Sequence, residues 1–382
     1  MIQLRYYQEA AVSGILNFFN QGKTLGLVVL PTGAGKSYVI AYAAEMVGGN
    51  VLVLCPTKEI LEQNYNKFRT ECPSTGAAMF SASVGRKDRS TVTFATIGSI
   101  VGHPELFQGF QKIIIDEAHK VGDGDDKAVE GMYQDFLAHM PAGSQVVGLT
   151  ATPFRLVEKT QYDSAARKFT VVSAKLYSLV GDGAYFNDLI YCCQVGELMK
   201  YGFLATCRYP RCHYGKDRET EVIDNIITEI YHNGGKAIVF TKSVKQADEM
   251  ANLYLNRGMS VASLSGSTTK ANRERIINGY RDGSIRILFN KKVLEIGFDD
   301  PATDNVVLLN TTYSLNSYYQ MVGRAIRTHP GKSFATIYDV GYNVKRFGPI
   351  ENLIYQRDYR GTWQMYSGVN QITEVELRNR NR

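Results

Sequence analysis

Residues 26–37 read GLVVLPTGAGKS, an apolar run that leads directly into a glycine-rich turn ending in Lys36 and Ser37. A strand, such a turn and a following helix present backbone N–H groups to phosphate at a helix N-terminus, where the helix dipole also favours anions. Gly33 and Gly35 let the backbone approach the phosphates, and Thr32 opens the turn. Lys36 can reach the β- and γ-phosphates, and the hydroxyl of Ser37 can bind Mg²⁺. The stretch predicts a site for a nucleoside triphosphate, ATP, with Mg²⁺.

A second apolar run ends in acids, at residues 113–119, which read IIIDEAH. Asp116 at the end of a strand can bind the same metal ion, and Glu117 can orient the attacking water. The general phosphate-binding pattern begins with a glycine, and Leu30 stands at that position here. Taken together, the two stretches predict that the chain hydrolyses ATP.

Composition sets broad limits on the class of protein. The 382 residues are enough for two domains of ordinary size, and 43 Lys and Arg against 37 Asp and Glu give a net charge of +6. This mildly basic balance is compatible with a polyanionic partner. The spacing of the six Cys residues fits no familiar zinc pattern, so we expect free thiols. The sequence lacks an 18-residue apolar run and a signal peptide, so we expect a soluble cytoplasmic protein with no membrane association.

Short apolar runs alternate with helix-like stretches along the chain, which predicts parallel sheets covered by helices on both faces. The expected strands occupy 25–30, 51–55, 91–95, 112–116, 145–150, 236–240, 259–264, 285–289, 305–310 and 334–340. Only the first five strands, between residues 25 and 150, include a phosphate-binding turn among their connections. We therefore expect an α/β protein of two domains that bind one ATP between them. The expected parts are domain one at 1–155, a less regular connector at 156–207, domain two at 208–345 and a tail at 346–382.

The second half contains QMVGRAIR at 320–327, where Arg324 and Arg327 are three residues apart. On a helix they would share one face. Two such cations can stabilise the charge on a transferring phosphoryl group, an effect worth about 10³–10⁵ in rate. We predict that they complete the site from domain two.

The ordered motifs resemble those of a superfamily 2 helicase core. The resemblance rests on LRYYQ (4–8), PTGAGKS (31–37), LCPTKEILEQ (54–63), ATIGS (95–99), DEAH (116–119), TATP (150–153), IVFTKS (238–243), GFDDP (297–301) and QMVGRAIR (320–327). The sequences of several motifs are similar to those of the RadD-like DNA-repair branch, which lies near UvsW-like phage helicases and restriction-enzyme motor subunits. RadD-like proteins carry a Cys-rich zinc segment after the core, whereas residues 346–382 contain no Cys. We therefore expect the motor alone, and the bare start before LRYYQ predicts no accessory domain.

The resemblance implies two RecA-like domains and assigns further roles. Gln8 would read adenine, with Arg5 as its companion, because an amide can both donate to and accept from a base edge. His119, Thr150 and Thr152 would couple the ATP site to the nucleic-acid site. From domain two, Gly297, Asp299 and Gln320 would contact the nucleotide.

The same resemblance implies contacts with the backbone phosphates of a nucleic-acid strand, made from loops at one sheet edge. The matching positions are Thr57, Lys58, Thr96, Ser99, Thr241, Lys242, Asn290 and Lys291. Such contacts do not read base sequence. We predict a monomeric ATP-driven DNA helicase or translocase acting in repair, recombination or replication, with repair or replication proteins as partners. Two alternatives stay open: an RNA helicase, and an ATP-gated nucleic-acid binding or recruitment factor that does not unwind.

Overall fold

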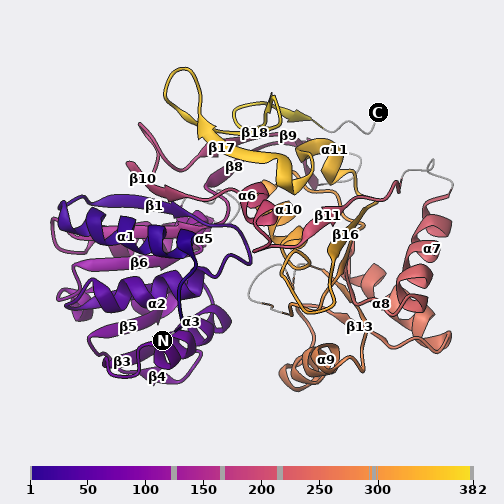
Figure 1. Ribbon diagram of the computed structural model, residues 1–382, viewed down its shortest axis with the longest axis horizontal. Coiled ribbons are helices and arrows are strands. Elements are labelled where there is room, and N and C mark those ends of the chain that lie inside the picture. The colour runs from indigo at the N-terminus through magenta and orange to yellow at the C-terminus, as the bar shows by residue number, and fades with distance from the viewer. Residues whose placement is uncertain are drawn as a thin grey trace. The chain divides into compact units, whose positions relative to one another are not determined.

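The computed structural model describes residues 2–121, 127–163, 168–212, 218–291, 293–294, 298 and 300–378 (Figure 1). The chain divides into two compact units. Unit 1 comprises Met1–Gln194 and Ile354–Arg382, and unit 2 comprises Val195–Leu353. The expected connector at 156–207 is thus divided between the units, and the expected tail belongs mostly to unit 1.

Unit 1 is built on an eight-stranded sheet with the order β10-β1-β7-β6-β2-β5-β3-β4. The paired strands run parallel, except that β4 is antiparallel to β3. The strands are β1 (Leu25–Val29), β2 (Val51–Cys55), β3 (Ala77–Ser81), β4 (Arg86–Lys87), β5 (Val92–Thr96), β6 (Lys112–Asp116), β7 (Gln145–Thr150) and β10 (Asp188–Cys192). Every residue of β2 and β5 is buried, as expected for apolar strands covered on both faces.

The helices of unit 1 follow the strands in the order that the sequence predicts. They are α1 (Tyr6–Asn20), α2 (Lys36–Met46), α3 (Lys58–Glu71), α4 (Ile97–Ile100) and α5 (Lys127–Ala138), with 3-10 turns η1 (Pro104–Phe107) and η2 (Ala118–Val121). Helix α2 contacts both α1 and α3. Because α2 begins directly at Lys36, its N-terminus lies at the glycine-rich turn.

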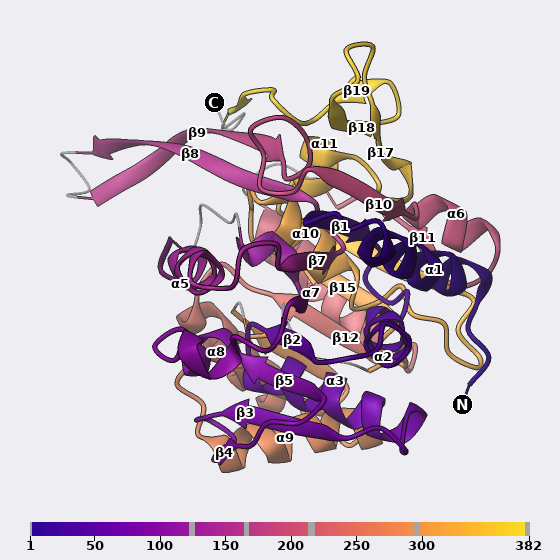
Figure 2. The same ribbon diagram turned by 90° about the vertical axis from the view of Figure 1, so that its left-hand side faces the viewer.

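A long antiparallel hairpin follows β7, where the sequence predicted a less regular connector. It consists of β8 (Phe154–Asp163) and β9 (Lys168–Ser178), and Figure 2 shows it extending beyond the strands of the central sheet. The prediction was wrong because consecutive residues Val157–Tyr162 of β8 are exposed on both faces. A strand of that kind has no apolar alternation for a pattern to reveal.

Residues after unit 2 return to unit 1 and form regular structure. Strands β17 (Leu353–Arg357), β18 (Trp363–Ser367) and β19 (Asn370–Gln371) form a three-stranded sheet, and β20 (Leu377–Arg378) pairs with β9. Tyr355 packs edge-on against Phe154, with ring centroids 5.3 Å apart. These contacts fix the returning segment onto the β8–β9 hairpin.

Unit 2 contains a parallel six-stranded sheet with the order β11-β16-β15-β12-β14-β13. Its strands are β11 (Thr206–Arg208), β12 (Ala237–Phe240), β13 (Val261–Leu264), β14 (Ile287–Asn290), β15 (Asn305–Leu308) and β16 (Phe334–Asp339). Its helices are α6 (Val195–Lys200), α7 (Glu219–His232), α8 (Val244–Asn256), α9 (Lys270–Asp282), α10 (Leu315–Val322) and α11 (Asn343–Phe347), with the 3-10 turn η4 (Ile350–Asn352). Apolar residues of α7 and α8 pack on the central strands in one core. Within the described ranges, no helix is both long enough and apolar enough to span a bilayer.

Candidate nucleotide site and nucleic-acid surface

The glycine-rich turn adopts the backbone conformation that the sequence predicts. Gly33 and Gly35 have φ angles of 85° and 81°, in the left-handed region that glycine adopts at little cost. A Cβ atom at Gly35 would lie 2.6 Å from Nε2 of Gln8, so a larger residue would have to displace the Gln8 amide. The turn caps the N-terminus of α2, and Lys36 and Ser37 occupy its first two positions. This geometry suits an anionic phosphate group.

The two acids at the end of β6 lie beside the turn. Nζ of Lys36 is 3.4 Å from Oε1 of Glu117, and both side chains are largely buried. Glu117 has a φ of 51°, a conformation that costs free energy for a non-glycine residue and is concentrated at functional sites. Burial and the neighbouring charge of Glu117 raise the pKa of Asp116 to about 6, whereas Lys36 opposes that shift.

A connected polar chain leads from these acids to the end of β7. Nδ1 of His119 is 3.4 Å from Oε2 of Glu117 and 3.1 Å from Oγ1 of Thr150. Oγ1 of Thr150 in turn accepts a hydrogen bond from the backbone N–H of Thr152 at 3.1 Å. The structure thus brings together the three residues expected to couple the sites, and all three are buried.

Side chains of the N-terminal segment form hydrogen bonds with the glycine-rich turn. Nε2 of Gln8 donates to the carbonyl of Ala34 at 2.9 Å, and its Oε1 accepts from the backbone N–H of Arg5 at 3.0 Å. The hydroxyl of Tyr7 also donates to the carbonyl of Ala34, at 3.1 Å. Gln8 and Tyr7 therefore position the turn, and the adenine-reading role of Gln8 and Arg5 stays a prediction.

Asn64 of α3 is a site residue that the sequence analysis missed. Its Nδ2 donates to Oδ2 of Asp116 at 2.7 Å, while the backbone N–H of Glu117 donates to Oδ1 at 2.8 Å. Asn64 is 2% exposed, on the same helix face as the buried Ile60, Leu61 and Phe68. A polar residue on the apolar face of a predicted helix was the signal that could have found it.

Unit 2 holds Arg324 in a buried network of its own. Arg324 is 7% exposed, donates to the carbonyl of Phe298, and donates from Nη2 to Oε1 of Gln320 at 3.0 Å. Helix α10 ends at Val322, so the expectation that Arg324 and Arg327 share a helix face was wrong. The helix ends because Gly323 caps it and a turn follows.

Arg327 lies at an isolated bridge with Leu204, next to the backbone hydrogen bond from Ala205 N–H to the carbonyl of Ile326. Burial lowers the pKa of the Arg327 guanidinium to about 10. Gly297 and Asp299, the other residues expected to contact the nucleotide from this unit, lie outside the described residues.

The positions expected to contact nucleic acid in unit 1 lie at or just after the ends of β2 and β5. Thr57 caps α3, where its Oγ1 accepts from the backbone N–H of Ile60, and Lys58 forms an ion pair with Glu62 at 3.5 Å. Oγ atoms of Thr96 and Ser99 are 2.8 Å apart. Because β2 and β5 are adjacent and parallel, their carboxyl ends bring these four residues to one sheet edge.

The corresponding positions in unit 2 differ from one another in exposure. Lys242 is exposed and forms an ion pair with Glu219, and Lys291 is half-buried. Thr241 and Asn290 are 1% and 0% exposed. Oγ1 of Thr241 donates to the carbonyl of Ser243, and Oδ1 of Asn290 accepts from the backbone N–H of Leu294. These two side chains therefore shape the ends of β12 and β14, and we do not include them among direct phosphate contacts.

The residues near the glycine-rich turn fit a hydrated Mg²⁺ ion bound with a nucleotide. Among the described residues, no group of three or more His, Cys, Asp or Glu side chains could hold a metal ion by itself. Mg²⁺ in phosphoryl-transfer sites is normally held by one or two protein oxygens together with substrate phosphates and water. The raised pKa of Asp116 beside Glu117 shows two buried carboxyl groups whose repulsion a cation would relieve.

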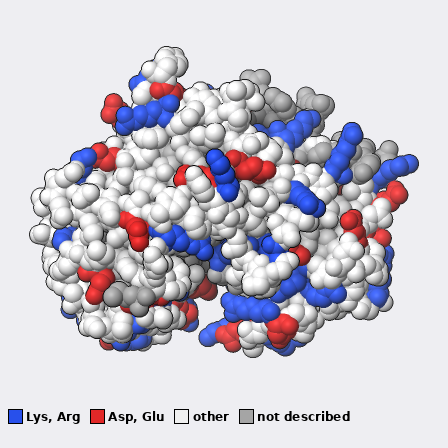
Figure 3. Space-filling view, in the orientation of Figure 1, with Lys and Arg blue, Asp and Glu red and all other residues white. Residues whose placement is uncertain are grey.

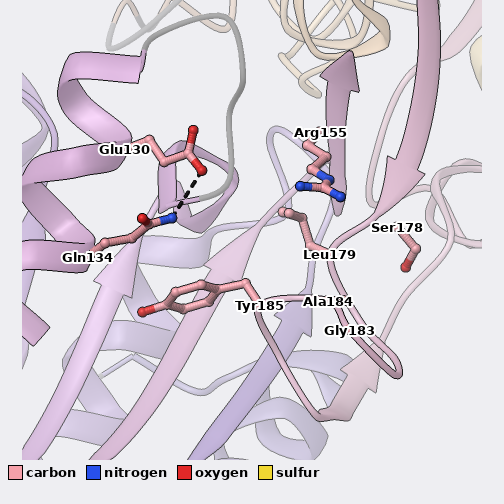
Figure 4. Close-up of a pocket in the computed structure, with 8 residues that line it drawn as sticks. All are labelled: Glu130, Gln134, Arg155, Ser178, Leu179, Gly183, Ala184 and Tyr185. Atoms are coloured by element: carbon pink, nitrogen blue, oxygen red, sulfur yellow. Dashed lines mark hydrogen bonds between the residues drawn. The ribbon is translucent and has the colours of Figure 1, made fainter. Parts of the chain in front are cut away.

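A separate cavity of about 230 Å³ lies in unit 1 (Figure 4). Glu130 and Gln134 of α5 line one side, where Gln134 donates to Glu130 at 3.0 Å, and Arg155 and Tyr185 line another. Ser178, Leu179, Gly183 and Ala184 complete its lining. No residue of the predicted nucleotide site is among these eight, so the cavity is distinct from that site.

Two sequence families match the chain. Residues 1–155 match "Type III restriction enzyme, res subunit", and residues 219–329 match "Helicase conserved C-terminal domain". The chain is 23% identical over 372 residues to the "DNA 3'-5' translocase XPB2" of Sulfurisphaera tokodaii, covering 85% of this chain and 79% of that protein. It is 28% identical over 270 residues to the "DEAD-box ATP-dependent RNA helicase 3B, chloroplastic" of Zea mays, covering 67% of this chain. The chain spans only 32% of that maize protein and 58% of a Schizosaccharomyces pombe relative named for a mitochondrial ATP-dependent helicase.

Solved structures share the fold. A fragment of an HsdR subunit of a type I restriction enzyme from Vibrio vulnificus has a TM-score of 0.66 at 23% identity, covering 90% of this chain and 65% of that one. Dbp5 of S. cerevisiae bound to RNA and ADP BeF3 has a TM-score of 0.62 at 17% identity, covering 87% and 83%. The two units are accordingly RecA-like domains. With the motif order and the matched families, these findings identify the chain as a superfamily 2 helicase core.

Proposed function

We propose that this protein is an ATP-driven DNA motor, a helicase or translocase that acts in DNA repair, recombination or replication. The observation that carries the proposal is the unbroken contact path within unit 1 from Lys36 through Glu117 and His119 to Thr150. It joins a phosphate-binding turn to the carboxyl end of β7, near the sheet edge where nucleic acid is expected. Such a path can couple nucleotide binding at the turn to the conformation of the strand-binding loops.

Each residue has a distinct part in hydrolysis. Lys36 and the backbone of the glycine-rich turn bind the phosphates, and Ser37 with Asp116 provides oxygens for Mg²⁺. When bound, Mg²⁺ would offset the negative charge of the phosphate oxygens. Glu117 exchanges its partner Lys36 for the attacking water, which it orients. From unit 2, Gln320 positions Arg324, and Arg324 and Arg327 stabilise the charge that develops during transfer. Gly297 and Asp299 belong to the same proposal.

The proposal of DNA as the track is supported by the relatives and neighbours that are named for DNA work. The XPB2 relative is a DNA translocase by name, and the restriction enzyme LlaBIII, solved bound to DNA, shares the fold at a TM-score of 0.65 with 16% identity, covering 88% of this chain and 27% of that one. The maize relative and Dbp5 keep an RNA helicase as the second candidate. Whether the track is DNA or RNA, the same residues provide the strand contacts: Thr57, Lys58, Thr96, Ser99, Lys242 and Lys291.

The test is the rate of ATP hydrolysis without nucleic acid and with single-stranded DNA, branched DNA or RNA. We expect stimulation by DNA that exceeds stimulation by RNA. The reverse order would identify an RNA helicase. A rate that is indifferent to all nucleic acids would refute the motor and favour an ATP-gated binding or recruitment factor.

A further inference from the structure

The loop between β17 and β18 displays one aromatic ring beside a cation, and a second cation lies at the end of β17. Tyr359 is 89% exposed, and its neighbours Arg357 and Arg360 are exposed as well. The guanidinium of Arg360 lies 5.0 Å from the centroid of the Tyr359 ring. Figure 1 shows this loop standing out from its sheet, and Figure 3 shows Lys or Arg side chains at its base. An exposed tyrosine ring offers a flat face on which a planar ligand can stack.

The loop is held in a fixed shape. Oδ1 of Asp358 accepts hydrogen bonds from the backbone N–H groups of Arg360 and Thr362, both at 2.9 Å. The backbone closes the turn through Asp358 N–H to the Thr362 carbonyl at 2.8 Å, and Gly361 has a φ of 83°. Because Asp358 serves the turn, its carboxylate is engaged with backbone donors while the two arginines remain exposed.

Aromatic rings brace the base of the loop. Arg357 lies 5.1 Å from the Trp363 ring, and Trp363 stacks on Tyr355 with centroids 5.2 Å apart. The Tyr355 ring packs on Phe154, and its hydroxyl is 2.6 Å from Oγ of Ser178. Phe154 follows Thr152 by two residues. The base of the loop that carries Tyr359 is therefore anchored in unit 1, which also carries the nucleotide site.

We propose that this loop binds an unpaired base of a nucleic-acid strand, with the Tyr359 ring stacked on the base and Arg357 and Arg360 on the neighbouring phosphates. The proposal rests on the proposed function, since it supplies a further contact with the same track. An exposed aromatic ring with two cations in the same loop region matches the π-face and the negative backbone of a single strand. An apolar protein partner would require a continuous apolar patch, and the residues around Tyr359 in this loop are charged or small and polar.

The experiment measures binding of the full chain to a fluorescent oligothymidine strand at several salt concentrations. We expect Tyr359→Ala to weaken binding about 5- to 100-fold with no change in the salt dependence, because stacking is lost and ionic contacts are kept. Tyr359→Trp should retain wild-type affinity. Arg360→Ala should instead reduce the slope of log affinity against log salt by about 0.7.

Val369→Ala is the matched control, because Val369 is 94% exposed in the loop at the other end of β18. It should bind like the wild type. A strand of abasic sugar-phosphate should bind wild type and Tyr359→Ala equally, since it offers no base to stack. ATP hydrolysis without nucleic acid should be the same in all these variants.

The outcomes separate this inference from the proposed function. If Tyr359→Ala binds the strand as tightly as Val369→Ala does, the loop is not a base-binding site, and the motor proposal stands provided that nucleic acid still stimulates hydrolysis. Equal losses of affinity by Tyr359→Ala on abasic and normal strands would also overturn base stacking. A wild-type chain that binds none of the nucleic acids would overturn both proposals.

Discussion

The amide of Asn64 donates to Oδ2 of Asp116 at 2.7 Å, so a helix that follows the second strand orients the acid at the end of β6. The remaining carboxylate oxygen accepts from the backbone N–H of Glu117. Each oxygen of the Asp116 carboxylate thus accepts a hydrogen bond, and the two bonds fix the orientation of the group. Second-layer hydrogen bonds of this kind commonly decide how well a carboxylate holds a cation.

Replacing Asn64 should weaken the proposed Mg²⁺ site. Asn64→Ala removes the donor and its stabilisation of the Asp116 anion, so the Mg²⁺ concentration for half-maximal ATP hydrolysis should rise about 10- to 100-fold. The measurement is ATP turnover titrated with Mg²⁺. Asn66→Ala, at an exposed position of the same helix, should leave the titration unchanged. An unchanged midpoint in Asn64→Ala would show that the hydrogen bond serves the fold alone.

Glu117→Gln should separate nucleotide binding from hydrolysis. The glutamine keeps the size of the side chain but loses the anion that orients water, so turnover should fall about 100-fold or more while ATP binding persists. Rapid-quench turnover and equilibrium binding of a fluorescent ATP analogue measure the two effects. Glu62→Gln, which removes the ion pair with Lys58 at 3.5 Å, is the control and should turn over normally. If Glu117→Gln loses ATP binding as completely as Lys36→Ala, Glu117 is a binding residue instead.

The stability of unit 1 should depend on the protonation of Asp116. Burial and Glu117 raise its pKa to about 6, above the value of about 3.9 in an unfolded chain. The folded state therefore binds more protons between these values, and the stability that protonated Asp116 contributes is lost as pH rises from about 4 to about 7. Asp116→Asn cannot ionise, so it should gain stability over the wild type across this window, on the order of 3 kcal/mol.

Denaturant unfolding of both proteins from pH 4 to pH 7 measures that difference. Asp182→Asn changes an exposed carboxylate, and its free energy of unfolding should depend on pH as that of the wild type does. A stability difference between Asp116→Asn and wild type that stays constant with pH would show that Asp116 has an ordinary pKa.

Arg324→Ala should slow hydrolysis by about 10³-fold or more while ATP binding changes little, because the phosphate-binding turn lies in unit 1. Arg324 is buried and bonded to Gln320, so a thermal melt must show that the variant remains folded. Arg324→Lys, which keeps a charge, provides a second folded variant. Arg281→Ala, an exposed arginine of α9, is the control. Normal turnover in folded Arg324→Ala would exclude its action on phosphate.

The sheets and the turn were predictable because their signals are local. Continuous apolar runs such as Val51–Cys55 are typical of buried parallel strands, and TGAGKS needs its glycines wherever it binds phosphate. The β8–β9 hairpin was missed because its exposed strands carry no periodic pattern. The end of α10 was missed because Gly323 is followed by residues that are compatible with a helix.

Within the site, the sequence identifies residue types but not their partners. It predicted Asp116 and Lys36 from their motifs, whereas Asn64 has a role only because α3 packs on β2, the strand next to β6. Thr241 and Asn290 sit at expected loop positions, yet tertiary packing buries their side chains. The role of Asn64 and the burial of Thr241 and Asn290 depend on contacts between distant segments, which a local sequence pattern cannot predict.

The return of residues 354–382 to unit 1 has a consequence for how the protein is made. Unit 2 is continuous in sequence, whereas unit 1 combines two separated segments, the second of which is synthesised after the whole of unit 2. Until then, Phe154 lacks its neighbour Tyr355 and β9 lacks its partner β20. Unit 1 is thus completed after unit 2, and a premature stop codon just before the codon of residue 354 would damage the ATP-binding unit, although most of that unit is encoded far upstream.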